Sequence, residues 1–261
     1  MNNNLFALKG AIIHTPDPKR FTIVDDGYLV CQNGLVQGVY EKLPEEFQGI
    51  PVRDYTGKLI IPGMADMHIH APQYGFRGLG MDLDLDSVWN TWFETYSLPE
   101  ESHYADLGYA DMAYEKFVGD LLKTTTTRLC IFGTIHRPAT ELLMDKLAEK
   151  GFAAYVGKLN MDRNSIEGLQ ETTEESLSET RKWLEETVNR HPYVKPMVTP
   201  RYTPSCTDAC MEGLQKLVEE FNVPVQSHLS EGLDEIEWVK ELKPEIEFYG
   251  QAYDMYGMLG G

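Results

Sequence analysis

The chain is poor in cysteine and has no long apolar run. Its four cysteines, Cys31, Cys130, Cys206 and Cys210, show no CxxC spacing. They are too few for a disulfide-stabilised secreted scaffold and favour a reduced, cytoplasmic protein. No segment approaches the roughly 20 apolar residues of a membrane span, and the N-terminal residues lack the apolar core of a signal peptide. We therefore expect a protein that is neither exported nor bound to a membrane.

Basic residues are scarce relative to acidic ones. The 261-residue sequence has 23 lysines and arginines against 41 aspartates and glutamates, which gives a formal charge of -18. Such a surface repels phosphate backbones and anionic lipids, so it argues against nucleic-acid and membrane partners. The chain is long enough to bury a substantial core. A small molecule is the expected ligand.

Several catalytic motifs are missing. The sequence has no HExxH, no phosphate-binding GxxxxGK(S/T) loop, no GxSxG elbow and no HxE with PCxxC pattern. These absences argue against zincin proteases, P-loop nucleotide hydrolases, α/β-hydrolases and the deaminases that carry the HxE pattern.

A pair of histidines is present at the end of an apolar strand. Residues 61–74 read IPGMADMHIHAPQY, in which one residue separates His68 from His70. Side chains alternate faces along a strand, so both imidazoles are expected on the same side. Two neutral imidazoles can share one cation, and a catalytic zinc takes about three protein ligands. Two ordinary core or surface histidines are the alternative.

The order of elements predicts an α/β protein in two parts. Residues 1–60 indicate a small β-subdomain, in which Asn33-Gly34 separates two β-rich runs as in a type I′ hairpin. Residues 61–261 alternate strands and helices, which favours a parallel sheet and a TIM-type β/α barrel. Strands are expected at 59–70, 126–135, 153–162, 195–203 and 223–230, and helices near 102–123, 139–150, 172–190, 207–221 and 233–242. A barrel needs eight units and this sequence supplies about five.

Further candidate residues lie at the predicted strand ends. Arg201 and Tyr202 end the fourth strand, His228 ends the fifth, and Glu231 follows three residues later. The active site of a barrel lies at the carboxyl ends of its strands, so these residues and Gln73 are expected near the histidine pair. Taken singly they have ordinary alternatives: a surface salt bridge, core packing, a histidine bonded to a carbonyl, an acid at a helix start and a turn residue.

The segment after the histidine pair is rich in aromatic residues, which could roof a flat apolar ligand or belong to the core. They are Phe76, Trp89, Trp92, Phe93 and Tyr96. A further histidine, His136, ends the second predicted strand and is expected to face the same pocket.

Three motifs resemble, in the same order, those of the amidohydrolase superfamily, and in particular its guanine deaminases. They are PGMADMHIHAPQY at 62–74, VTPRYTPSC at 198–206 and QSHLSE at 226–231. The resemblance implies a metal-dependent hydrolase barrel. It also implies zinc-dependent hydrolytic deamination of guanine to xanthine and ammonia, with one zinc ion per chain, a neutral purine as substrate and a homodimer of the complete enzyme.

The resemblance also assigns roles. His68, His70 and His228 would bind the metal, and Glu231 would be the catalytic residue that transfers protons. The guanidinium of Arg201 suits the O6 and N7 acceptors of guanine, and Gln73 offers both a donor and an acceptor. The residues expected to contact the substrate are His70, Gln73, Arg201, Tyr202, His228 and Glu231.

Two groups of the family have no match in this sequence. The family places a further histidine after the sixth strand and an aspartate after the eighth, whereas no histidine follows His228, and Asp234 and Asp254 lie outside matching motifs. We therefore expect a truncated chain that lacks part of the catalytic machinery of the family. The alternatives are an amidohydrolase for another cyclic amide or amino-heterocycle, and a non-catalytic zinc-binding remnant that pairs with a separate C-terminal chain.

Overall fold

The computed structural model describes residues 4–83 and 88–259, and within them all side chains except those of residues 88–91 and 94. The chain divides into two compact units, Met1–Gly63 and Met64–Gly261. The predicted boundary followed residue 60. None of the helices in the described ranges combines the length and apolar character needed to cross a membrane.

The first unit is a four-stranded sheet in the order β3-β2-β1-β4. Its strands are β1 (Leu5–Asp17), β2 (Arg20–Gln32), β3 (Leu35–Tyr40) and β4 (Val52–Ile60). β1 pairs antiparallel with β2 and parallel with β4, and β2 pairs antiparallel with β3. Asn33 and Gly34 join β2 to β3 with φ of 52° and 83°. Positive φ at both positions is the type I′ geometry, so the predicted hairpin is confirmed.

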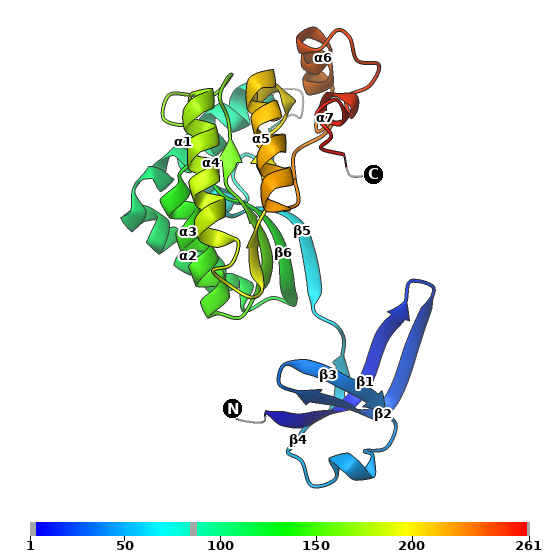
Figure 1. Ribbon diagram of the computed structural model, residues 1–261. Coiled ribbons are helices and arrows are strands. Elements are labelled where there is room, and N and C mark those ends of the chain that lie inside the picture. Colours follow the sequence, from blue (N-terminus) through cyan, green and yellow to red (C-terminus); the bar gives the residue numbers. More distant parts are fainter. Residues whose placement is uncertain (1–3, 84–87, 260–261) are drawn as a thin grey trace. The chain divides into compact units, whose positions relative to one another are not determined.

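The second unit has a parallel sheet whose strands follow chain order. β5 (Met64–His70), β6 (Thr126–Phe132), β7 (Ala153–Gly157) and β9 (Val194–Pro196) pair in the order β5-β6-β7-β9 (Figure 1). Two shorter strands, β8 (Leu159–Asn160) and β10 (Thr199–Pro200), pair parallel with each other. The predicted series of β/α units is therefore confirmed.

Prolines interrupt two of the predicted strands. The strand expected at 59–70 is two strands, because Pro62-Gly63 separates β4 from β5. The segment 223–230, expected as a strand, forms a single parallel bridge between Val225 and Val198. Pro200 and Pro224 have no N–H to donate, so a continuous ladder cannot form there. Two backbone hydrogen bonds, from Gln226 N and to Pro224 O, still hold this segment parallel to its neighbour.

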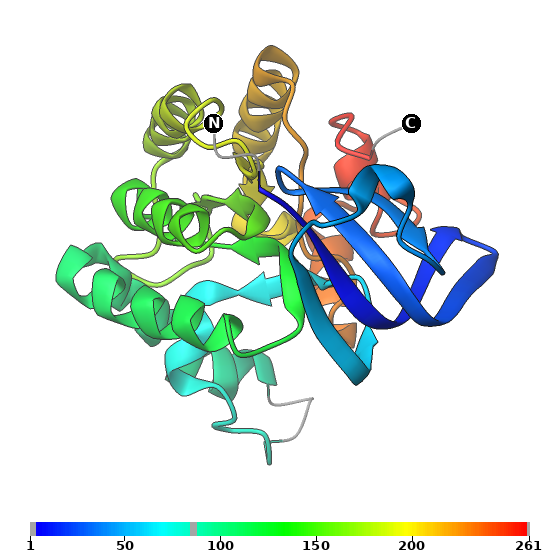
Figure 2. The same cartoon turned by 90° about the horizontal axis from the view of Figure 1, so that it is seen from below.

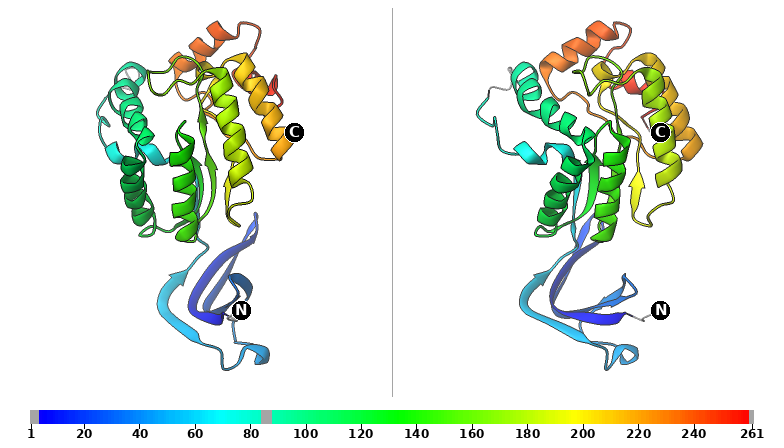
Figure 3. Two further views of the ribbon diagram at one scale, coloured as in Figure 1. Left: turned by 60° about the vertical axis from the view of Figure 1, so that its left-hand side comes forward. Right: turned by 90° about the vertical axis from the view of Figure 1, so that its left-hand side faces the viewer.

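Four helices cover one face of the parallel sheet and follow one another around it (Figures 2 and 3). They are α2 (Leu107–Leu121), α3 (Arg137–Glu149), α4 (Thr173–Thr187) and α5 (Asp208–Phe221). A short helix, α1 (Leu98–Ser102), precedes them, and α6 (Leu233–Leu242) and α7 (Gln251–Asp254) follow and lie beyond the end of the sheet (Figure 1). α4 begins where the sequence predicts it, with Thr172 and Glu175 forming a reciprocal capping box. A π-helix, Val88–Ser97, precedes α1 and was not predicted.

The core of the second unit lies between these helices and the sheet. α5 shows why the sequence folds this way: Cys210, Met211, Leu214 and Leu217 recur on one face and are all buried. The same core contains Phe117 from α2, Leu143 and Leu147 from α3, Trp183 from α4 and Ile131 and Val156 from the sheet. Helix packing thus fixes the strands, and through them the side chains at their carboxyl ends.

Those carboxyl ends are brought to one edge by the register of the sheet. His70 lies opposite Phe132, and Phe132 lies opposite Gly157. A Cβ atom at Gly157 would meet Thr199 Oγ1 at 1.9 Å, so only glycine allows the β10 segment to approach this closely. The end of β10 then delivers Arg201 to the same edge.

Candidate metal centre

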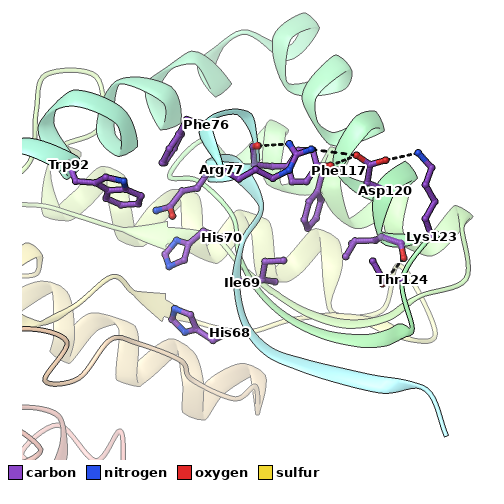
Figure 4. A pocket seen from close by; sticks show the side chains of 13 residues that line it. His68, Ile69, His70, Phe76, Arg77, Trp92, Phe117, Asp120, Lys123 and Thr124 are labelled. Carbon is purple, nitrogen blue, oxygen red and sulfur yellow. Dashed lines mark hydrogen bonds and ion pairs between the residues drawn. The ribbon is translucent and has the colours of Figure 1, made fainter. Parts of the chain in front are cut away.

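Three histidines converge at this edge and are called the histidine cluster: His68, His70 and His228. Their nearest ring nitrogens all lie within 4.8 Å of one another. The Nε2 atoms of His70 and His228 are 2.9 Å apart, although 158 positions separate the two residues in the sequence. Figure 4 shows His68 and His70 side by side on β5, with Trp92 and Phe76 beside His70. The alternation predicted for the strand therefore does place both imidazoles on one face.

The ring of Phe132 and a backbone carbonyl oxygen orient these imidazole rings. The Phe132 ring lies 4.5 Å from the His70 ring and 4.4 Å from the His228 ring, measured between centroids. His228 Nδ1 lies 2.7 Å from the carbonyl oxygen of Arg201. Since that oxygen can only accept, Nδ1 carries the proton of the neutral ring. The lone pair of His228 is therefore on Nε2, which faces the other two histidines.

The electrostatics of the cluster keep its buried rings neutral. Burial lowers the pKa of His70 well below the usual 6.5, and His228, Arg201 and His68 lower it further. Burial also lowers the pKa of His228 to about 4, despite the opposing effect of its hydrogen bond to Arg201. Neutral imidazole is the form that binds metals.

The donor set fits a zinc ion. Nitrogens that share one zinc at about 2.0–2.1 Å in tetrahedral geometry lie about 3.3 Å apart. The Nε2 atoms of His70 and His228 are 2.9 Å apart, and the nitrogens of all three histidines lie within 4.8 Å of one another. His70 Nδ1 is buried and has no hydrogen-bond partner among the described residues. A cluster of neutral imidazoles with unused nitrogens is what a catalytic zinc site with an open position requires. His68, His70 and His228 are therefore the residues that could hold the metal.

A cavity of about 250 Å³ opens beside the cluster. It brings together the predicted metal ligands, the predicted substrate-binding residues and two aromatic rings. Its lining comprises His68, His70, Gln73, Trp92, Phe93, Arg201, Tyr202, His228 and Glu231. Of the aromatic residues that the sequence left open between roof and core, Trp92 and Phe93 line this cavity, Phe76 is buried, and the side chain of Trp89 lies outside the description.

Arg201 is fixed by an ion pair inside the protein, and the surface salt bridge considered from the sequence is wrong. Its guanidinium contacts Glu101 through Nη1 at 2.5 Å and Nη2 at 3.1 Å, and both side chains are almost fully buried. Burial by itself would lower the pKa of Arg201, but the Glu101 carboxylate outweighs it and raises that pKa. The arginine is thus charged and oriented before any ligand binds.

Glu101 is the functional residue that the sequence analysis missed. It also accepts a hydrogen bond from Gln73 Nε2 at 3.0 Å, so it connects two of the predicted substrate-binding residues. Glu101 lies at the end of a short helix and 100 positions from Arg201. No local pattern marks such a residue, and only the buried charge of Arg201 could have suggested that a carboxylate partner exists.

Glu231 lies at the rim of the cavity, just before α6. The helix begins at Leu233 and has Gly232 as its N-cap, so Glu231 lies outside the helix. It is therefore neither the N-cap nor an acid of the first turn, which was the alternative considered from the sequence. Its backbone N–H donates to Glu235 Oε2 at 2.8 Å. Burial and the nearby Glu235 carboxylate raise the pKa of Glu231, against the lowering effect of Arg201. A carboxyl with a raised pKa beside a metal site is suited to accept and return a proton.

Tyr202 and His136 differ in how they relate to the cavity. Tyr202 is buried and lines the cavity, and its ring packs edge-on against Trp238 at 6.3 Å between centroids. His136 does not line it: this residue is the N-cap of α3 and borders a separate cavity with Tyr104 and Glu171. The prediction that His136 faces the same pocket is wrong, because the chain continues past the end of β6 before it reaches His136.

Comparison with known proteins identifies the family. Residues 59–261 match the model of the amidohydrolase family. The chain belongs to the amidohydrolase family. This amidohydrolase is 37% identical to a guanine deaminase from Dictyostelium discoideum over 99% of its own length and 60% of the relative. The resemblance in the three sequence motifs is thereby confirmed.

Solved structures show the fold of this amidohydrolase. A guanine deaminase from C. acetobutylicum with guanine bound in its active site is 41% identical, with a TM-score of 0.93 over 99% of this chain and 61% of that one. An adenosine deaminase from Xanthomonas campestris with bound zinc has a TM-score of 0.77 over 98% of this chain and 55% of that one; at 16% identity it shows the fold alone. The fold is thus that of a metal-dependent hydrolase barrel, represented here in part, since the chain spans about 60% of the relatives it matches.

Proposed function

We propose that this amidohydrolase catalyses the zinc-dependent hydrolytic deamination of guanine to xanthine and ammonia. One observation carries the proposal: Gln73, Arg201 and Glu231 line the same cavity as the histidine cluster. The similarity to guanine deaminases over nearly the whole chain supports this choice of substrate. Since the chain spans about 60% of those relatives, the activity is proposed for the whole enzyme.

Different residues of the chain bind the metal, transfer the proton and bind the substrate. His68, His70 and His228 hold the zinc ion, which supplies Lewis-acid activation of water when bound. Glu231, whose pKa is raised, takes a proton on its carboxylate from the attacking water and returns it to the departing nitrogen.

Other residues that line the cavity bind the substrate. Arg201 donates to acceptors of the purine such as O6 and N7, Gln73 pairs with its ring nitrogens, and Tyr202 borders the ring. His70, His228 and Glu231 contact the carbon that loses its amine. The cavity then admits the purine in one orientation, with that carbon towards the metal.

The decisive experiment measures ammonia release from guanine with zinc supplied, for the wild type and for Glu231→Gln. Loss of the proton-transferring group predicts a decrease in rate of about 10²- to 10⁴-fold, with zinc content unchanged. Glu237→Gln is the matched control, because Glu237 is an exposed residue on α6 that forms an ion pair with the exposed Lys240.

Three outcomes would contradict the proposal. Full activity of Glu231→Gln would remove this residue from the mechanism. Ammonia release from another amino-heterocycle but not from guanine would show that guanine is not the substrate. Zinc uptake without ammonia release from any of these compounds would favour the non-catalytic remnant.

We also propose one zinc ion per chain, a homodimer of the complete enzyme and a cytoplasmic location. The single histidine cluster at the cavity supports the ion count, and the four free cysteines support a reducing compartment. The formal charge of -18 supports a small-molecule substrate in preference to nucleic acid or membrane.

A further inference from the structure

Glu101 is a buried carboxylate that accepts hydrogen bonds from two side chains lining the cavity, Arg201 and Gln73, and from Ser97. Its Oε2 accepts from Arg201 Nη1 at 2.5 Å. Its Oε1 accepts from Arg201 Nη2 at 3.1 Å, from Gln73 Nε2 at 3.0 Å and from Ser97 Oγ at 3.0 Å. Three donors thus converge on Oε1, and the fourth reaches Oε2.

These contacts decide which end of the Gln73 amide faces the cavity. An ionised carboxylate can only accept, so the atom of Gln73 beside it must be the NH₂ group. The same NH₂ group donates to Ser97 Oγ at 3.0 Å, and the Ser97 hydroxyl has already given its proton to Glu101. The NH₂ group is therefore turned towards Glu101 and Ser97, and the carbonyl oxygen, on the other side of the amide, is the atom that Gln73 can offer to a ligand.

The same carboxylate limits what Arg201 can offer. A guanidinium has five N–H groups, and the bidentate contact with Glu101 uses two of them. The remaining groups can only donate. Arg201 and Gln73 both contact Glu101 Oε1, at 3.1 and 3.0 Å, so their end groups lie side by side and can reach neighbouring atoms of one ring.

We propose that Glu101 is a positioning residue that gives the site a fixed polarity, with a donor from Arg201 beside an acceptor from Gln73. The matching ligand edge is a cyclic amide, a C=O next to an N–H, as at O6 and N1 of guanine. A ring with an amino group at that carbon presents the reverse pattern and leaves buried polar groups unpaired. The choice of a purine rests on the proposed function, whereas the polarity follows from Glu101.

The test compares guanine with 2,6-diaminopurine, which keeps the 2-amino group but reverses the polarity of the neighbouring edge. Binding to metal-free protein is followed by tryptophan fluorescence, since Trp92 lines the cavity. The wild type should prefer guanine by about tenfold or more. In Glu101→Gln the new amide can present either its oxygen or its NH₂ group to Gln73. The ratio of the affinities for guanine and 2,6-diaminopurine should therefore fall towards one. An unchanged preference would overturn the proposal.

Glu100→Gln is the matched control. Glu100 is the preceding residue on α1, but its carboxylate accepts from Tyr109 and not from the substrate site. This variant should keep the preference of the wild type. Should Glu101→Gln fail to fold, Ser97→Ala removes one of the two acceptors of the Gln73 amide and leaves the ion pair intact. It should reduce the preference by a smaller factor.

A second measurement separates this inference from the proposed function. The side-chain amide protons of Gln73, assigned in NMR spectra through their loss in Gln73→Glu, should exchange slowly with water in the wild type and faster in Ser97→Ala. Slow exchange without binding of either purine would reject guanine as substrate and support the positioning role. Fast exchange in the wild type would overturn that role whichever purine binds.

Discussion

The histidine cluster can be compared with a second group of potential metal ligands in the same unit, Asp162, Cys206 and Cys210, which we call the acid-thiol cluster. In both groups the possible ligand atoms lie within 4.8 Å of one another. The chemical state of these atoms differs. Asp162 accepts from Thr207 N at 2.7 Å, and its other oxygen accepts from the hydroxyls of Thr173 and Thr207.

The thiols of the acid-thiol cluster are occupied as well. Cys206 Sγ donates to the carbonyl oxygen of Asn160 at 3.1 Å. The hydrogen bond with Cys206, followed by burial, raises the pKa of Cys210, so this thiol stays protonated. Thiolates, and not thiols, bind metals. The comparison shows that proximity alone does not make a metal site: the donors must also be deprotonated and free of internal partners.

The largest expected effect is on zinc binding by the histidine cluster. His70→Ala removes one of three ligands, and the affinity for zinc should fall by more than the roughly 10- to 100-fold that loss of an outer-shell partner costs. A competition titration with a chelating dye measures this. His136→Ala, which changes a histidine outside the cavity, should bind zinc like the wild type, and equal affinity in both variants would place the metal elsewhere.

The acid-thiol cluster should instead respond in stability. Asp162→Ala leaves the donors of Thr173 and Thr207 without their acceptor, which should lower the free energy of unfolding by about 1–3 kcal/mol. Urea denaturation measures the loss, and Glu212→Ala on the exposed face of α5 is the control. Zinc affinity should not change. A decrease in affinity like that of His70→Ala would show that the two groups are not chemically distinct.

Acid should destabilise the metal-free protein through the histidine cluster. The pKa values of His70 and His228 are lowered, that of His228 to about 4, whereas an unfolded histidine titrates near 6.5. Below about pH 6.5 the unfolded state binds more protons, so the free energy of unfolding should decrease from pH 6.5 towards pH 4. Urea denaturation at several pH values should show a shallower decrease for His228→Gln; equal slopes would mean that this ring does not titrate as inferred.

A rise in pH should destabilise the protein through the acid-thiol cluster. Of the four effects predicted here, this one should be the smallest. The raised pKa of Cys210 keeps the folded thiol protonated, whereas an unfolded cysteine loses its proton near pH 8.5. Stability from this group is complete below that pH and is lost as the pH rises above it. The free energy of unfolding should therefore fall less between pH 8 and 10 in Cys210→Ala than in the wild type. A steeper fall in the variant would contradict the assignment.

Local signals in the sequence were enough to predict most of the fold. Asn33-Gly34 predicted the hairpin, the pattern at 172–190 predicted α4, and the spacing of His68 and His70 predicted a shared face. Each of these features depends on residues within a few positions of one another. These local structures do not depend on contacts between distant residues.

The remaining features depend on contacts between distant residues. Glu101 gains its role from Arg201, 100 positions later, and no pattern around Glu101 records that pairing. The segment 223–230 has the apolar residues of a strand, but prolines on it and on its neighbour restrict it to one bridge. Local patterns therefore predict the residues that line the cavity, whereas the buried partner of Arg201 depends on a contact between distant parts of the chain.

The separation between His70 and His228 has a consequence for folding. An ion held by both rings would join positions 158 residues apart, and so would act as a crosslink across most of the second unit. Closing so long a loop is entropically costly for an unfolded chain, in which the two rings lie far apart. An ion that binds the folded cluster and not the unfolded chain would therefore stabilise the arrangement of β6, β7 and β9 between the two rings.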